Sequence, residues 1–266
     1  MDYNAIAKLN ALHHDRIEAL TSNPTPRVPI ALCLDVSATM ATVESGTFEP
    51  TGKRVQVDGH WFDLVNGGVT RIDLLQDGVR EFYTAIQQDD IAMYSAEVCI
   101  VSFNDKAQCL LDFANLDLQD ELPHLTARGS TAMGEGLNLS LDLLEQRKKE
   151  FQDNGVDYFQ PWLVILTDGE PNAGAAEAAE LARAEERIRT LTAQHKLTVL
   201  PIGVGNEANL KVLSRFSADG KALRLQGLEF QNFFQWLGKS VVEVSQSTPG
   251  DCNELDTSAI SGWESL

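Results

Sequence analysis

The sequence lacks the segments that carry a protein into or across a membrane. No stretch reaches the roughly 18 consecutive apolar residues that a spanning helix needs. Residues 1–5 contain no positively charged region followed by an apolar core, which is the pattern of a secretory signal peptide. We therefore expect a cytoplasmic protein without a membrane contact.

Positive charge and cysteine are also scarce. The chain has 21 Lys and Arg against 39 Asp and Glu, for a formal net charge of -18. Nucleic acid is therefore not an expected partner, because binding a phosphate backbone requires Lys and Arg to release its counterions. Of four cysteines, Cys33 and Cys99 lie in apolar strand-like segments, whereas Cys109 and Cys252 are scattered. We interpret them as reduced thiols that serve as small hydrophobic side chains.

The length and apolar content fit one large domain. The chain has 266 residues, of which 43% are hydrophobic, and single domains of this size are common. We expect an N-terminal helix (5–20) and linker within residues 1–28, a main domain over residues 29–247, and a mobile acidic tail over residues 248–266. The tail lacks hydrophobic periodicity and is rich in Ser, Asp and Glu.

Strand-like and helical patterns alternate along the main domain. Such alternation predicts an α/β fold: a doubly wound, mostly parallel six-stranded sheet with one antiparallel edge strand and helices on both faces. The expected strand order is 3-2-1-4-5-6, with the third strand at the edge. The expected strands span residues 29–34, 97–103, 107–113, 162–167, 197–202 and 222–225, and the expected helices span residues 73–88, 132–149, 175–194, 208–217 and 228–244.

An insertion interrupts this alternation after the first strand. Within residues 47–70, Asp58-Gly59 separates two runs that favour β-structure. This dipeptide indicates a two-residue type I′ turn, whose central residues both need positive φ. We predict an inserted β-hairpin, with Trp61 and Phe62 either packed in a small local core or offered to a partner.

Oxygen-bearing side chains follow two of the buried strands. Asp35, Ser37 and Thr39 come at alternate positions directly after the first strand, and Asp168-Gly169 ends the fourth. Thr131 precedes a helical segment. Two carboxylates and three hydroxyls, without His or Cys, suit a hard divalent cation such as Mg²⁺, Mn²⁺ or Ca²⁺ better than zinc.

The expected topology brings these side chains together. The first and fourth strands are neighbours whose crossovers leave in opposite directions, which opens a crevice at their carboxyl ends. Each group also has an ordinary interpretation: Asp35, Ser37 and Thr39 as turn caps, Thr131 as a helix N-cap, and Asp168-Gly169 as a turn. Glu170 either lines the crevice or is an acidic residue near a helix start. Gly203-Val204-Gly205 is interpreted as a glycine turn rather than a dinucleotide-binding loop.

Three segments resemble the metal-ion-dependent adhesion site of von Willebrand factor A (VWA) domains. The family pattern is D-x-S-x-S, a separate Thr and Asp-Gly, and it matches Asp35, Ser37, Thr39, Thr131 and Asp168. Thr39 stands where Ser is usual, and Ala38 where Gly is common. The segments LDVSATM, RGSTAMGEGL, LTDGEP and STPGD look most similar to the bacterial tellurite-resistance, TerY-like branch.

The resemblance implies a non-enzymatic protein-interaction module. Ser37, Thr39 and Thr131 would be hydroxyl ligands, Asp35 and Asp168 would bind directly or through water, and a partner's Asp or Glu would complete the cation's shell. The branch implies a bacterial tellurite or stress-response setting with kinase-like or phosphatase-like partners. Trp61, Phe62 and Glu170 are further candidate partner contacts.

One enzymatic alternative stays open. A D-x-S-x-T motif after a strand is similar to the motif of haloacid-dehalogenase phosphohydrolases, in which Asp35 would be the nucleophile. Those enzymes carry a second Asp where this chain has Ser37. Loss of a general acid/base costs typically about 10²–10⁴-fold in rate, which favours the non-enzymatic interpretation.

Overall fold

The computed structural model describes residue 18 and residues 20–57, 60–119, 121–206, 208–225 and 229–249. Most of the expected N-terminal helix, the Asp58-Gly59 turn and nearly all of the expected tail lie outside the described residues. Among the described residues, no helix is both long enough and apolar enough to cross a membrane.

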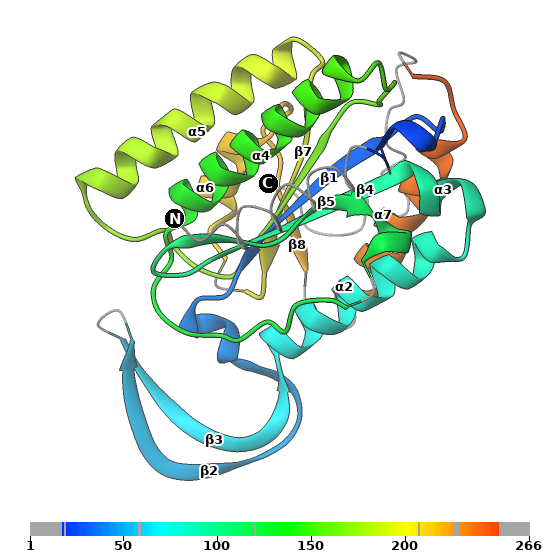
Figure 1. Cartoon of the computed structure of the whole chain (residues 1–266). Coiled ribbons are helices and arrows are strands. Elements are labelled where there is room, and N and C mark those ends of the chain that lie inside the picture. Colours follow the sequence, from blue (N-terminus) through cyan, green and yellow to red (C-terminus); the bar gives the residue numbers. More distant parts are fainter. Residues whose placement is uncertain are drawn as a thin grey trace, which may run out of the picture.

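A six-stranded sheet forms the centre of the molecule (Figure 1). Its order is β5-β4-β1-β6-β7-β8, and only β5 runs antiparallel to its neighbour. This confirms the predicted order and the antiparallel edge strand. The strands are β1 (Val28–Asp35), β4 (Ala96–Phe103), β5 (Ala107–Asn115), β6 (Trp162–Thr167), β7 (Thr198–Val204) and β8 (Leu223–Leu225).

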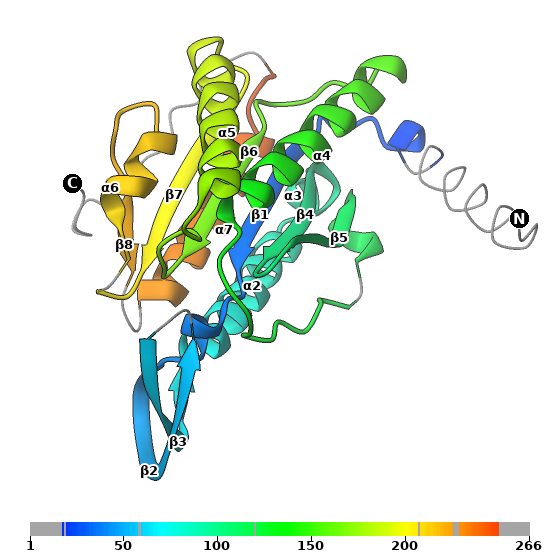
Figure 2. The ribbon, with the colours of Figure 1, turned by 90° about the vertical axis from the view of Figure 1, so that its left-hand side faces the viewer.

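Helices cover both faces of the sheet (Figures 1 and 2). Every residue of β1, β4 and β6 is buried, which explains their nearly continuous apolar sequences. Ile30 and Leu32 pack in the core formed with α2 (Arg71–Gln87) and α7 (Glu229–Ser245). The alternate residues Ala31 and Cys33 pack in a second core with α4 (Met133–Asp153), α5 (Ala175–Ala193) and α6 (Leu210–Leu213).

Short helical turns complete the chain. The predicted helix over residues 208–217 is instead α6 followed by the 3-10 turn η3 (Ser214–Phe216). The sequence analysis did not identify α3 (Asp90–Ser95) or the turn η2 (Leu116–Leu118). Helix α3 is short, but its start is fixed because Asp89 Oδ1 accepts a hydrogen bond from the Ala92 amide at 2.8 Å.

The inserted hairpin is longer than expected and forms a separate two-stranded sheet. It consists of β2 (Val43–Val57) and β3 (His60–Thr70), so it begins four residues before the predicted boundary. Figure 2 shows it extending away from the helical layers. A capping box between Thr70 and Asp73 joins its last residue to α2.

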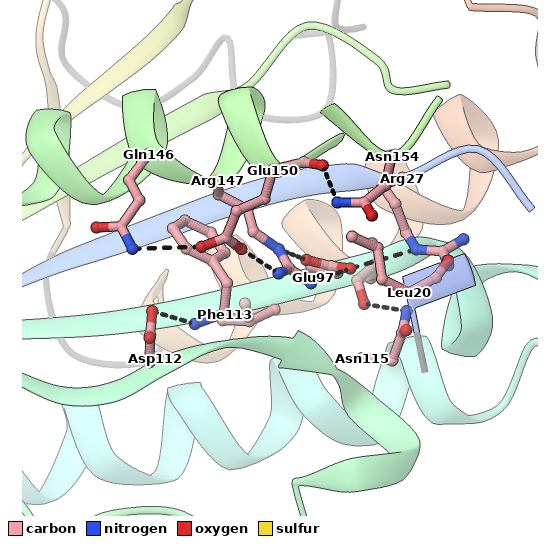
Figure 3. Close-up of polar contacts among 12 residues, drawn as sticks. Leu20, Arg27, Glu97, Asp112, Phe113, Asn115, Gln146, Arg147, Glu150 and Asn154 are labelled. Carbon is pink, nitrogen blue, oxygen red and sulfur yellow. Dashed lines mark hydrogen bonds and ion pairs between the residues drawn. The ribbon is translucent and has the colours of Figure 1, made fainter. Parts of the chain in front are cut away.

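A buried ion network lies near the amino ends of β1 and β4 (Figure 3). The Glu97 carboxylate accepts from Arg27 Nε at 3.2 Å and from Arg147 Nε at 2.6 Å. Arg27 Nη2 also donates to the backbone carbonyls of Leu20 and Asn23, at 3.0 Å each. The segment that precedes β1 is thereby tied to the core.

Candidate metal centre

Asp35 and Asp168 lie side by side at the carboxyl ends of two neighbouring strands. Asp35 ends β1 and Asp168 follows β6, and the preceding residues Leu34 and Leu166 are paired in the sheet. Both aspartates are buried, with relative exposures of 0% and 2%. The strand order therefore brings the two carboxylates to the same edge of the sheet.

The chain turns sharply after Asp35 and returns Thr39 to the crevice. The Ser37 amide donates to Asp35 Oδ1 at 2.8 Å, and the 3-10 turn η1 (Ala38–Ala41) follows. Ser37 Oγ and Thr39 Oγ1 lie 3.0 Å apart, and Thr39 Oγ1 donates to Asp168 Oδ1 at 2.7 Å. Four of the five predicted ligands therefore form one connected cluster, which the tight turn after β1 brings together.

Thr131 reaches the same crevice from the loop before α4. A Cβ placed on Gly169 would lie 3.6 Å from Thr39 Oγ1 and 3.7 Å from Thr131 Oγ1, so both hydroxyls face this glycine. Thr131 is not the helix cap: the N-cap residue of α4 is Ala132, which makes no side-chain capping bond. Ser37 likewise makes no capping bond to η1. The structure thus removes the simple capping interpretation for these two hydroxyls.

Neighbouring loops brace the position of Thr131. Its amide donates to Asn172 Oδ1 at 2.8 Å, and the Asn172 amide donates to the Thr131 carbonyl at 2.9 Å. Asp105 Oδ1 accepts from both the amide and the hydroxyl of Ser130, at 2.8 Å each. Gly129 has a φ of +73°, and a Cβ there would lie 2.6 Å from the Asp105 carboxylate. The loop therefore needs glycine at this position.

Burial disfavours the charged forms of the two aspartates. Burial raises the pKa of Asp35 to about 7, and the nearby charge of Asp168 adds to this effect. The pKa of Asp168 is also raised by burial, against the lowering effects of the Thr39 hydroxyl and the Arg71 guanidinium. Two buried carboxylates this close favour a positive charge between or beside them.

Arg71 supplies one such charge, and the sequence analysis did not identify it. Its Nη1 contacts Asp168 Oδ2 at 2.9 Å and its Nε contacts Glu44 Oε1 at 2.5 Å. The guanidinium packs over Gly205, where a Cβ would lie 2.6 Å from Nη2. Gly205 has a φ of +76°, and the predicted glycine turn therefore also makes room for Arg71. Thr167 was missed as well: its hydroxyl donates to Asp35 Oδ2 at 2.5 Å.

The donor set fits a hard divalent cation. The crevice presents carboxylate and hydroxyl oxygens, which are the ligand types of Mg²⁺, Mn²⁺ and Ca²⁺. Asp35, Asp168, Ser37, Thr39 and Thr131 would hold the ion. Arg71 is the one described group that opposes it, since it repels a cation and occupies one oxygen of Asp168.

The candidate partner contacts lie farther out. Trp61 is 65% exposed, and Phe62 is half-buried beside it on β3. Both pair with the last residues of β2, away from the junction with the domain. Glu170 is exposed on the loop after β6, where its Oε1 accepts from Asn209 Nδ2 at 2.6 Å. Whether these three residues bind a partner stays a prediction.

Comparison with known sequences gives no family assignment. No protein-family model matches the chain. A curated relative, thiamine-phosphate synthase from Syntrophomonas wolfei, is 29% identical over 164 residues, which cover 60% of this chain and 75% of the relative.

Comparison with solved structures shows the fold. A von Willebrand factor type A protein from Catenulispora acidiphila has a TM-score of 0.53 at 16% identity, over 82% of this chain and 43% of that chain. The PilB minor pilin (D319A mutant) of Streptococcus sanguinis has a TM-score of 0.55 at 16% identity, over 83% and 62%. The chain thus spans about half of these two proteins. The vWF domain of the pili tip protein Mfa5 from Porphyromonas gingivalis has a TM-score of 0.54 at 9% identity, over 84% and 98%. The chain therefore has the fold of a von Willebrand factor A domain.

Proposed function

We propose that this chain is a non-enzymatic protein-interaction module that binds a divalent cation in the crevice between β1 and β6. The ligands are Asp35, Ser37, Thr39, Thr131 and Asp168. The observation that carries the proposal is the connected set of oxygens from Ser37 through Thr39 to Asp168. Thr39 and Asp168 are 129 residues apart in sequence and meet at the carboxyl ends of β1 and β6.

The charge of the ligand set favours capture of an acidic partner. Three of the five ligands are neutral hydroxyls, and one oxygen of Asp168 is already shared with Arg71. The bound ion would supply a Lewis-acidic position for an incoming oxygen ligand. We propose that an Asp or Glu side chain of a partner protein fills it, with Trp61, Phe62 and Glu170 as supporting contacts.

The biological setting is proposed from the motif resemblance alone. The D-x-S-x-T, R-G-S-T and T-D-G-E-P segments are similar to the TerY-like branch. We therefore place the protein in a bacterial, cytoplasmic tellurite or stress-response system with a kinase-like or phosphatase-like partner. The preferred cation in this setting is Mg²⁺.

The enzymatic alternative is a phosphohydrolase with Asp35 as nucleophile, and the similarity to a protein named thiamine-phosphate synthase adds a different enzyme activity to be tested. The geometry favours it less. Asp35, the nucleophile of a phosphohydrolase mechanism, is fully buried, and both its oxygens accept hydrogen bonds, from Ser37 and Thr167. Assays of phosphatase activity and of thiamine phosphate formation, each with and without Mg²⁺, test this alternative. Phosphatase turnover that is lost in Asp35→Asn would establish the phosphohydrolase alternative.

The cation proposal is tested by thermal unfolding. A ligand that binds only the folded state raises Tm as its concentration increases. We expect Mg²⁺ or Mn²⁺ to raise the Tm of the wild type and not that of Asp35→Asn. Asp77→Asn is the control, because Asp77 is an exposed carboxylate on α2. Absence of a cation-dependent shift in the wild type, or an equal shift in Asp35→Asn, would refute the site.

The partner proposal needs a separate experiment. Proteins retained from a cell lysate by the wild type in Mg²⁺ are compared with those retained in chelator and by Asp35→Asn. A partner that is retained only by the wild type in Mg²⁺ supports capture through the ion. A partner retained equally in all three conditions would show that binding does not use the crevice.

A further inference from the structure

A second group of potential metal ligands lies on the face of the sheet that α4 covers, opposite the face that α2 covers. It consists of Cys99 on β4 and of Cys109 and Asp112 on the edge strand β5. One ligand atom from each residue lies within 4.8 Å of the others. No other group of three such residues this close together occurs within the part of the chain that the structure describes.

Two irregularities in β5 create this cluster. In a regular strand, residues three apart point to opposite faces, so Cys109 and Asp112 would be separated by the sheet. Here Val101 pairs with Cys109 while Ile100 pairs with Leu111, and the register shifts again before Val98 pairs with Ala114. The first shift adds a residue to β5 between Cys109 and Leu111. It therefore brings Asp112 to the face of Cys109 and Cys99.

The exposure of the three ligand residues increases from the core to the surface. Cys99 is fully buried, Cys109 is half-buried and Asp112 is exposed, so an ion can enter from the open edge of the sheet. Figure 3 shows Asp112 on β5, where its Oδ1 accepts from the Phe113 amide at 2.8 Å. The side-chain hydrogen bond with Cys109 and burial both raise the pKa of the Cys99 thiol.

We propose that Cys99, Cys109 and Asp112 form a binding site for a thiophilic divalent cation such as Zn²⁺. Two thiolate sulfurs about 2.3 Å from a tetrahedral Zn²⁺ lie about 3.8 Å apart, so the observed spacing needs only side-chain adjustment. Three protein ligands leave a fourth position for water or an external ligand. On binding, the thiol protons of Cys99 and Cys109 are released to solvent.

This site differs in chemistry from the crevice at the strand ends. The crevice offers only oxygen ligands, which suit hard cations, whereas two sulfurs select soft or borderline ions. A metal bridge between β4 and β5 would also fasten the edge strand, which β4 alone holds in the sheet. The protein would then carry two cation sites that respond to different metals.

Cadmium titration tests the site directly, because Cd²⁺ bound to thiolates gives an ultraviolet charge-transfer absorption that oxygen ligands do not give. The experiment uses the full chain with Cys252→Ser, which removes the thiol outside the described residues. We expect one saturable Cd²⁺ equivalent with this absorption, release of two protons, and competition by Zn²⁺. Absence of the absorption would overturn the proposal.

Variants separate this cluster from other thiols. In the Cys252→Ser background, Cys109→Ser should abolish the absorption, and the mild change Asp112→Asn should weaken Cd²⁺ binding about tenfold or more, since loss of even an outer partner costs roughly 10–100-fold. Cys33→Ala and Asp117→Asn are controls for a thiol and a carboxylate outside the cluster. If Cys109→Ser does not fold, the affinity of Asp112→Asn for Cd²⁺ still tests the site, because Asp112 is exposed. Unchanged binding in that variant would overturn the assignment of the third ligand and with it the site.

Discussion

At the scale of single residues, Arg71 links the crevice to the hairpin. Its guanidinium lies between Asp168, a candidate metal ligand, and Glu44 on β2. It is only 5% exposed, so these ion pairs are poorly screened by water. Arg71 is therefore an internal counter-ion of Asp168, and the same guanidinium also pairs with the hairpin residue Glu44.

Replacing Arg71 should have opposite effects on cation binding and on stability. In Arg71→Gln we expect Mg²⁺ binding to be tighter by about tenfold or more, because two unit charges about 4 Å apart repel each other by about 4 kcal/mol at an effective dielectric near 20. Without cation, the variant should lose about 3–5 kcal/mol, the cost of breaking a buried pair. Calorimetric titration and urea unfolding measure the two effects. Arg80→Gln, an exposed arginine on the same helix, is the control, and weaker Mg²⁺ binding in Arg71→Gln would contradict this role.

Thr39 tests which part of the side chain matters. Its hydroxyl contacts both Ser37 and Asp168, and the family pattern has Ser at this position. We expect Thr39→Ser to keep the Mg²⁺-dependent rise in Tm and the isosteric Thr39→Val to lose it, because only the hydroxyl can be a ligand. Melting curves with increasing Mg²⁺ give the answer. Equal shifts in both variants would remove Thr39 from the ligand set.

At the scale of elements, the hairpin of β2 and β3 is the part of the structure with least support from the domain. It pairs with no strand of the main sheet, and it exposes Phe48, Val55, Trp61 and Leu64. A two-stranded hairpin is only marginally stable alone in water, and exposed apolar side chains grouped on one element are typical of an interaction surface.

We expect that removal of the hairpin leaves the crevice intact. Replacement of residues 47–69 by a short Gly-Ser loop keeps Glu44, Thr70 and Arg71, so the ion pairs and the helix cap remain. We expect an unchanged Mg²⁺-dependent Tm shift and a weaker partner interaction. The single change Trp61→Ala should reproduce part of the loss, by about 1–2 kcal/mol or more if Trp61 is an anchor. Unaltered partner affinity in the loop variant would leave the hairpin without a binding role.

The elements also show how far the sequence determines the structure. Strands β1, β4 and β6 were predicted within one residue at each end, because complete burial on both faces gives them uninterrupted apolar sequences. Helix α3 was missed since six residues are too few to show helical periodicity. The bulges in β5 have no local signal, because register depends on the pairing with β4.

In the crevice too, residues with a local sequence signal were predicted and residues that arrive through distant contacts were not. Asp35, Ser37, Thr39 and Asp168 were found because they follow buried strands directly, and topology then brings strand ends together. Arg71 and Glu44 meet the site through ion pairs between distant residues. A long side chain at the start of a helix can reach in many directions, so no sequence pattern assigned its contact with Asp168.

At the scale of the whole molecule, the ion network of Arg27, Glu97 and Arg147 holds the end of the sheet opposite the crevice. We expect Glu97→Gln to lower the free energy of unfolding by about 3–5 kcal/mol, because it leaves two buried guanidinium groups without their shared carboxylate. Glu150→Gln is the control, since it removes a partly exposed partner of Arg147 and leaves Glu97 in place. Urea unfolding measures the difference. A loss below about 1 kcal/mol in Glu97→Gln would show that the network is not needed for stability.

The position of that network also sets the direction in which the domain would carry mechanical load. Arg27 fastens the chain where it enters β1, and Gln246, just past α7, contacts Asp89 Oδ2 at 3.0 Å near the start of α3, at the same end of the sheet. A partner held at the crevice would pull on the other end of β1. Tension between the two ends therefore runs along β1, whose hydrogen bonds to β4 on one side and β6 on the other are loaded together in shear rather than opened one at a time. The central strand would therefore resist such tension through both of its neighbours at once.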